Sequence, residues 1–223
     1  MSMKEPGQKR LLPPVARDVR IAGSAKKLRR EKRKEQLLEC ALKLFARKGY
    51  YSTTVADIVR EAGVARGTFY LYFNNKRDIF QKLLENNFSY IFRTLPDLKL
   101  TREMNEEQLR EALLFALRKL LSHRNSRDFI TLMIEGASGV DKALSEQVEH
   151  FYKTMTNIFC GYVARAQSLG KAKKTDPYLL ARFIVGILKE TFYLWSRQEV
   201  NNLDQLADSL LDFVMYGIRG NKT

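Results

Sequence analysis

The chain has 223 residues, of which 45% are hydrophobic, and a formal net charge of +14. This length and apolar content predict one large or two small folded domains and exclude a chain that is disordered throughout. The sequence has no apolar run long enough to cross a membrane and no apolar stretch typical of a secretory signal near residue 1, so we expect a cytoplasmic protein without a membrane partner.

The positive charge is concentrated at the front of the chain. Residues 1–80 contain 19 Lys and Arg against 8 Asp and Glu, whereas residues 81–223 contain 20 against 17. This asymmetry favours a polyanionic partner, although a basic tail that only keeps the protein in solution would give the same counts.

The first two predicted elements are a flexible basic arm and a helix. Residues 1–28 contain prolines and glycines and show no helical period, which predicts the arm. From about residue 29 apolar residues recur at helical spacing, and Gly49 ends this first helix.

Two short helices are predicted next. Thr54 supplies a capping hydroxyl for the first of them, and Asp57 stands at the capping-box position three residues later. Gly63 ends that helix, and only "GVA" separates it from the following one. Two helices joined by a tight turn that contains a glycine are typical of a helix-turn-helix.

The third helix carries four aromatic residues within five positions, in "FYLYF" at residues 69–73. Phe69 and Phe73 are four positions apart, so we expect both rings to pack against the first two helices. Tyr70 and Tyr72 fall on other faces of the helix. From the residues alone, Tyr70 fits core packing and DNA contact equally well.

The stretch "GYYSTTVADIVREAGVARGTFYLYFNNKRDIF", residues 49–80, resembles the DNA-binding signature of the TetR/AcrR family of transcriptional regulators. The elements TTV, AGV, GTFY and YF occur in the family's order and spacing without a gap. The resemblance implies an all-α protein, with a three-helix DNA-binding domain at residues 29–77 and a helical effector-binding and dimerisation domain at residues 78–223. It also implies a homodimer that binds double-stranded DNA at a palindromic operator and, by family precedent, represses transcription.

The resemblance assigns DNA contacts within this motif. The hydroxyls and backbone N–H groups at the start of the second helix suit a phosphate, and Tyr72 and Lys76 would also contact the DNA backbone. Arg66 is the expected base reader, because its guanidinium can pair with two acceptors of guanine, and Gly67 permits close approach. The expected DNA contacts are Thr53, Thr54, Arg66, Gly67, Thr68, Tyr70, Tyr72 and Lys76.

The basic run "KKLRREKRK", residues 26–34, lies just upstream of this motif. Such a run is often only a solvated helix face. Beside a DNA-binding domain, it could instead act as an arm that reaches into a minor groove.

The remainder of the chain is predicted to be helical. The fourth helix, "KRDIFQKLLENNFSYIF", is expected to belong to both domains, so that displacement of its rear end tilts its front end. Further helices are predicted at about residues 103–123, 126–136, 140–169, 176–199 and 202–218.

We expect an apolar effector site in the second domain, because nearly every helix there contributes an aromatic ring or a thioether. Simple core packing is the alternative for any one of these residues. The family binds its ligands between these helices, and "SHRN" and "ARFIVGILKETFYLW" are distantly similar to acyl-CoA-responsive members, which suggests a long-chain acyl thioester. The expected lining residues are Phe88, Phe92, Phe115, Phe129, Met133, Phe151, Met155, Phe159 and Tyr162.

The last two predicted helices carry apolar residues on more than one face, so each needs more than one packing partner. A monomeric bundle with both helices inside would satisfy this pattern. The resemblance implies instead a four-helix interface with the same helices of a second copy. The expected interface residues are Gly186, Glu190, Tyr193, Leu210 and Phe213.

Nothing in the sequence indicates an enzyme, a cofactor or a metal site. His123 and His150 lack a nearby nucleophile or second metal ligand, and Cys40 and Cys160 are isolated. No glycine-rich phosphate loop or GxSxG motif occurs. We therefore predict a ligand-responsive transcriptional regulator, with an effector-independent or architectural DNA-binding protein as the alternative.

Overall fold

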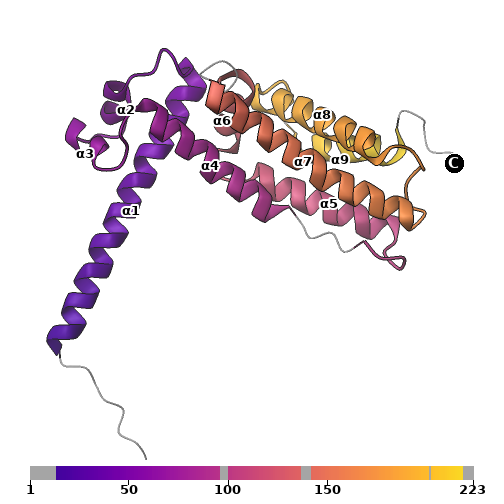
Figure 1. Ribbon diagram of the computed structural model, residues 1–223, viewed down its shortest axis with the longest axis horizontal. Helices are drawn as coiled ribbons and strands as arrows, with labels where there is room; N and C mark the ends of the chain where they lie inside the picture. Colours follow the sequence, from indigo (N-terminus) through magenta and orange to yellow (C-terminus); the bar gives the residue numbers. More distant parts are fainter. Residues whose placement is uncertain (1–13, 96–99, 137–141, 201, 218–223) are drawn as a thin grey trace, which may run out of the picture.

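The computed structural model describes residues 14–95, 100–136, 142–200 and 202–217, and every regular element among them is helical (Figure 1). The all-α prediction is confirmed. The elements are α1 (Pro14–Lys48), α2 (Val55–Glu61), α3 (Arg66–Tyr70), α4 (Lys76–Thr94), α5 (Glu106–Leu121), α6 (Ser126–Thr131), the π-helical turn η1 (Leu132–Gly136), α7 (Lys142–Ser168), α8 (Pro177–Ser196) and α9 (Leu203–Tyr216).

Helix α1 is longer than we expected. Residues 14–28, which we assigned to a flexible arm, are helical, while residues 1–13 lie outside the described residues. Pro14 occupies the first helical position, where its missing N–H costs no hydrogen bond, and the Ala, Leu, Lys and Arg residues that follow are strong helix formers. The front half of α1 therefore extends away from the other helices as a rod (Figure 1).

The helices form two neighbouring groups that α4 connects (Figure 1). The rear half of α1 packs with α2 and α4, α3 packs on α2, and α1 also contacts α6 and η1 of the second group, where α5 lies beside α4. One continuous core runs through both groups, from Leu37 on α1 through Phe80 and Phe88 on α4 to Met155 on α7. Movement of α4 must therefore disturb packing in both groups.

Capping residues fix several helix ends as the sequence predicts. Thr54 is the N-cap of α2 and completes a capping box with Asp57. Asp176 caps α8 by accepting a hydrogen bond from the backbone N–H of Tyr178, and Pro177 follows it. None of the described helices combines the length and apolar character of a membrane span.

Candidate nucleic-acid interface

The aromatic run at residues 69–73 divides between core and surface, as predicted. The side chains of Phe69 and Phe73 are only 0% and 2% exposed, and their ring centroids lie 5.6 Å apart. Tyr70 is 48% exposed on the outer side of α3. Tyr72 is half-buried against the edge of the core. Two buried rings thus anchor α3 and leave its outer face open to a partner.

The first residues of α3 form an open surface. Arg66 and Gly67 are exposed, and the guanidinium carbon of Arg66 lies 6.0 Å from the ring centroid of Tyr70. A Cβ atom added to Gly67 would meet no atom within 4 Å. Packing within the chain therefore does not require glycine here, whereas close approach of an outside partner would.

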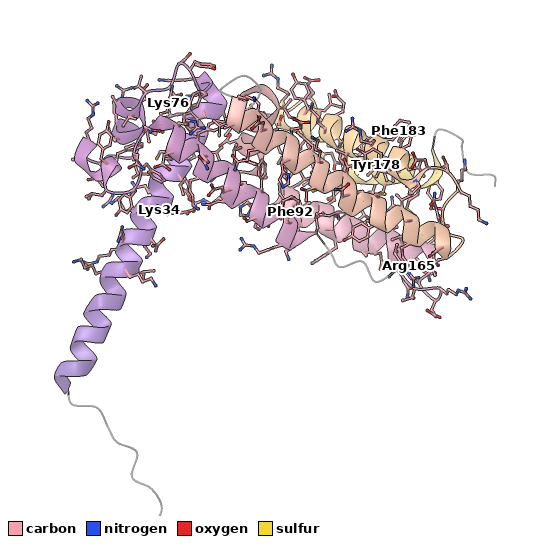
Figure 2. All side chains as sticks on the ribbon, viewed as in Figure 1. Lys34, Lys76, Phe92, Arg165, Tyr178 and Phe183 are labelled. Atoms are coloured by element: carbon pink, nitrogen blue, oxygen red, sulfur yellow. The ribbon has the colours of Figure 1, made fainter. Side chains whose placement is uncertain are left out.

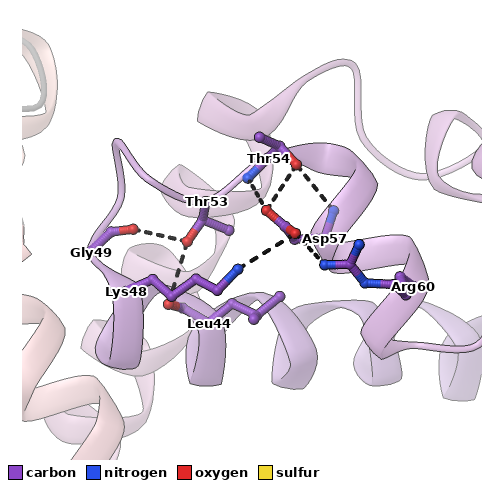
Figure 3. A network of polar contacts seen from close by, with 7 residues as sticks. All are labelled: Leu44, Lys48, Gly49, Thr53, Thr54, Asp57 and Arg60. Carbon is purple, nitrogen blue, oxygen red and sulfur yellow. Dashed lines mark hydrogen bonds and ion pairs between the residues drawn. The ribbon is translucent and has the colours of Figure 1, made fainter.

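The Thr53 side chain lies in the protein interior and not on the predicted DNA-binding surface. Its side chain is fully buried, and its hydroxyl donates to the carbonyl oxygens of Gly49 at 2.8 Å and Leu44 at 3.3 Å (Figure 3). A buried hydroxyl needs an acceptor within the protein, and these two carbonyls near the end of α1 provide it. The phosphate contact predicted for the Thr53 side chain is wrong.

Thr54 is exposed and takes part in a local network at the start of α2 (Figure 3). Its hydroxyl accepts from the backbone N–H of Asp57 at 3.1 Å, and the Asp57 carboxylate accepts from the backbone N–H of Thr54 at 3.0 Å. That backbone hydrogen bond, with a second one from the Thr54 hydroxyl, lowers the pKa of Asp57 to about 2. A phosphate at this helix end would meet an ionised carboxylate as well as Lys48 and Arg60, so contact through Thr54 stays a prediction.

The Lys76 side chain is also placed differently from the prediction. Its ammonium donates to the carbonyl oxygens of Tyr50 at 2.7 Å and Tyr51 at 3.3 Å, and it lies 4.3 Å from the Tyr50 ring centroid. The side chain is half-buried, and this burial lowers the pKa of Lys76. Lys76, labelled in Figure 2, thus ties the start of α4 to the α1–α2 loop and does not match the open phosphate-binding cation we expected.

Most residues of the predicted effector site pack together between α4 and α7. The rings of Phe88 and Phe151 stack with centroids 4.2 Å apart, and Phe92 and Phe129 contact the same pair. Further members surround this stack: Met133 and Met155 are buried, Phe159 packs against the cluster, and Tyr162 contacts Phe159.

Phe115 does not belong to this set, because its side chain is 69% exposed. Leu114, Leu117 and Leu121 form the buried face of α5 and pack with α8 and α9. Phe115 follows Leu114 directly and so points away from that face. Its assignment to the effector site is wrong.

The predicted dimer residues also separate into two groups. Gly186, Glu190 and Phe213 are exposed, and Tyr193 is half-buried. Leu210 is only 5% exposed and packs within the chain against Trp195 and its neighbours, so its assignment to a dimer interface is wrong. The exposed face of α8 also includes two aromatic residues outside that list, Tyr178 and Phe183 (Figure 2).

A polar contact between the two helix groups was not predicted. Arg124, which precedes α6, pairs with Glu39 on α1 at an Nη1–Oε1 distance of 2.9 Å. His123 stacks on Tyr90 of α4 with centroids 3.7 Å apart, and burial lowers the pKa of His123. These partners lie far apart in the sequence, so no local pattern could have revealed them. The loop before α6 is thus joined to α1 through Glu39 and to α4 through Tyr90.

Known proteins with similar sequences and folds agree with this arrangement. Residues 37–83 match the family model for bacterial regulatory proteins of the tetR family. The chain is 28% identical over 189 residues to the fatty acid metabolism regulator protein of Bacillus subtilis (strain 168), a match that covers 82% of this chain and 94% of the relative.

Two solved structures share the fold. The transcriptional regulator FadR from Bacillus subtilis, in complex with stearoyl-CoA, aligns with a TM-score of 0.65 and 26% identity over 83% of this chain and 99% of that one. The fatty acid degradation regulator FadR from Bacillus halodurans aligns with a TM-score of 0.67 and 23% identity over 83% and 96%. Members of this family are DNA-binding regulators and not enzymes, as the sequence indicates. Residues 37–83 thus carry a DNA-binding domain of the tetR family, and most of the chain is similar in sequence and fold to transcriptional regulators.

Proposed function

We propose that this regulator is a homodimeric repressor that binds a palindromic operator through α2 and α3 and is released by an apolar small molecule. The observation that carries the proposal is the division of α3, whose buried face is anchored by Phe69 while Arg66 and Tyr70 remain exposed. A short helix held in this way can enter a major groove without losing its packing. Repression is the action typical of the family.

Dimerisation is supported by the exposed face of α8. Leu179, Phe183 and Gly186 recur at spacings of four and three, which places them on one side of the helix, and Phe213 on α9 adds a fourth exposed apolar position. Monomeric proteins seldom leave several large apolar side chains together in water. A twofold dimer would bury this face and present two α3 helices to two operator half-sites.

An effector site is supported by the aromatic cluster between α4 and α7. Phe88 and Phe92 belong to α4, the helix that also packs against the DNA-binding unit, so a ligand that separates them from Phe151 displaces α4 or α7. A relative with the same fold binds stearoyl-CoA. Long-chain acyl-CoA is therefore our leading candidate. It can release DNA only to the extent that it binds the displaced state more tightly.

Arg66→Ala is expected to weaken specific DNA binding without unfolding the protein. Loss of a guanidinium that reads a base should cost about 1 to 3 kcal/mol and relax the preference at one operator position. Fluorescence anisotropy with the operator and with single-base variants measures both effects. Arg102→Ala is the matched control, since Arg102 is an exposed arginine outside the DNA-binding unit. Unchanged affinity and unchanged base preference in Arg66→Ala would exclude this face of α3 as the reader.

Stearoyl-CoA is expected to lower the affinity for operator DNA at micromolar concentration. Met133→Trp should reduce this response more than it weakens DNA binding without ligand, because it fills space beside the Phe88–Phe151 stack with a larger side chain. Phe159→Ala should reduce the response by removing a ring from the same cluster. Phe115→Ala, an exposed ring outside the cluster, is the control and should respond normally. If a broad panel of apolar metabolites leaves the DNA complex intact, the effector-independent alternative is supported instead.

A further inference from the structure

Four cations in the front part of α1 lie along one face of the helix. Lys26, Arg29, Arg30 and Arg33 recur at spacings of three, one and three residues, which places them along one side of the helix, and all four are exposed. We call these four residues the basic stripe. Four residues after Arg33, the same side of α1 continues with Leu37, which is fully buried in the core shared with α2 and α3.

The acidic residues of this stretch lie elsewhere on the helix. Glu31 and Glu35 fall on the side of α1 that is opposite the basic stripe by helical geometry. No carboxylate among the described residues forms an ion pair with a member of the stripe. A segregated and uncompensated row of charge attracts a polyanion more strongly than the mixed charge of an ordinary solvated helix face.

The basic stripe and the end of α3 line one open groove of 660 Å³. Thr68, Leu71 and Tyr72 form the other wall of this groove, and the guanidinium carbon of Arg30 lies 6.0 Å from the ring centroid of Tyr72. Leu71 is 71% exposed. The groove therefore adjoins the surface that we propose for operator binding.

Gln36 fixes the direction in which α1 leaves the DNA-binding unit. Its side-chain amide donates to the carbonyl oxygen of Ala62 at the end of α2 at 2.8 Å, and its oxygen accepts from Arg33 at 2.8 Å. The base of the stripe is thus tied to the helix-turn-helix. The stripe is presented at a defined angle to α3, as a flexible arm would not be.

From this placement we propose that the basic stripe binds phosphates of the duplex that flanks the segment read by α3. The proposal rests on operator binding through α3 and extends the contacted site along the DNA. An α-helix with its side chains is about 10 to 12 Å across, whereas the minor groove of B-DNA is about 6 Å wide. The stripe therefore contacts the backbone and does not enter an undistorted minor groove, as a flexible arm could. Lys34, which follows the last residue of the stripe and is not part of it, is labelled in Figure 2.

The test is the salt dependence of binding to a duplex of random sequence and about 40 base pairs, because phosphate contacts need no operator. The full-length variant K26Q/R29Q/R30Q leaves the contact between Arg33 and Gln36 intact. Each phosphate that the variant no longer neutralises should make the slope of log K against log salt shallower by about 0.9, which amounts to about 2.7 for three phosphates. The matched control R102Q/K173Q/K174Q removes the same charge from exposed positions outside the DNA-binding unit and should keep the wild-type slope.

Duplex length supplies a second readout. Lengthening the DNA beyond the segment that α3 covers should increase the affinity of the wild type more than that of K26Q/R29Q/R30Q. Equal slopes and equal length dependence for variant and wild type, with unchanged helix content by circular dichroism, would overturn the proposal and leave the stripe to another acidic partner. Failure of the proposed function gives a different result: the protein would bind operator and random DNA equally well, and Arg66→Ala would not change the ratio of the two affinities.

Discussion

Phe69→Ala is expected to destabilise the DNA-binding unit by about 3 to 5 kcal/mol, the typical cost of removing a fully buried aromatic side chain. Phe69 has no exposed surface and contacts the rings of both Tyr70 and Phe73. A small domain is stable by only about 5 to 15 kcal/mol, so this loss is a large fraction of the total. Guanidinium denaturation followed by circular dichroism measures it, with the operator complex followed in parallel.

Tyr70→Ala is the matched control for this prediction. Tyr70 is the next residue of the same helix but is half exposed, so its removal should change stability by roughly 0.5 kcal/mol or less and should weaken DNA binding. The two substitutions are therefore expected to differ in kind: Phe69→Ala lowers the free energy of unfolding, whereas Tyr70→Ala weakens DNA binding. Equal destabilisation by both variants would mean that α3 is not divided into an anchored and an open face.

Helical periodicity explains why most of the fold could be predicted. The rings of Phe69 and Phe73 follow the period and are buried, and the boundaries expected for the later helices agree with α5 to α9 within a few residues. The same period also held a signal that we missed. Leu114, Leu117 and Leu121 mark the buried face of α5, and Phe115 falls outside it. Choosing Phe115 because it is aromatic, against the period of its own helix, produced the error.

Other features depend on contacts that the local sequence does not encode. Thr53 and Thr54 are identical neighbours, and the local sequence does not show that only the Thr53 hydroxyl meets the carbonyls of Leu44 and Gly49. Lys76 donates to the carbonyls of Tyr50 and Tyr51 in the α1–α2 loop, which lie 26 and 25 residues earlier in the sequence. Glu39 and Arg124 meet through tertiary packing alone.

The contact between Glu39 and Arg124 adds a route between the two helix groups. The continuous core already links α4 with α7, and α1 itself packs against α6 and η1; this ion pair adds a charged contact beside that packing. A ligand that displaces α4 would thus have to shift the DNA-binding unit while two contacts hold the helix groups together, namely the apolar core and this ion pair. The Arg124 side chain is 74% exposed and that of Glu39 is 17% exposed, so this pair should contribute about 1 kcal/mol or less to stability.

Phe183→Asp is expected to separate the proposed dimer into monomers. Phe183 is 56% exposed on α8 in the single chain, so an aspartate there costs the folded monomer little. In a twofold interface the change occurs twice, and each copy removes an apolar anchor and places a charge in a buried site. The combined cost should be on the order of 4 kcal/mol or more, which weakens dimerisation about a thousandfold. Sedimentation velocity over a concentration series measures this shift.

The control for this variant is Phe115→Asp, which places the same charge on an aromatic residue that is 69% exposed on α5 and should leave the dimer intact. Gly186→Leu provides an independent test of the same face. A Cβ atom on Gly186 would meet no atom of its own chain within 4 Å, so any effect of a leucine on assembly must come from the second copy. We expect Gly186→Leu to keep its helix content and to dissociate, because a larger residue at this position would hold the paired α8 helices apart. A dimer that survives both Phe183→Asp and Gly186→Leu would place the interface elsewhere, and the exposed face of α8 would then need another partner.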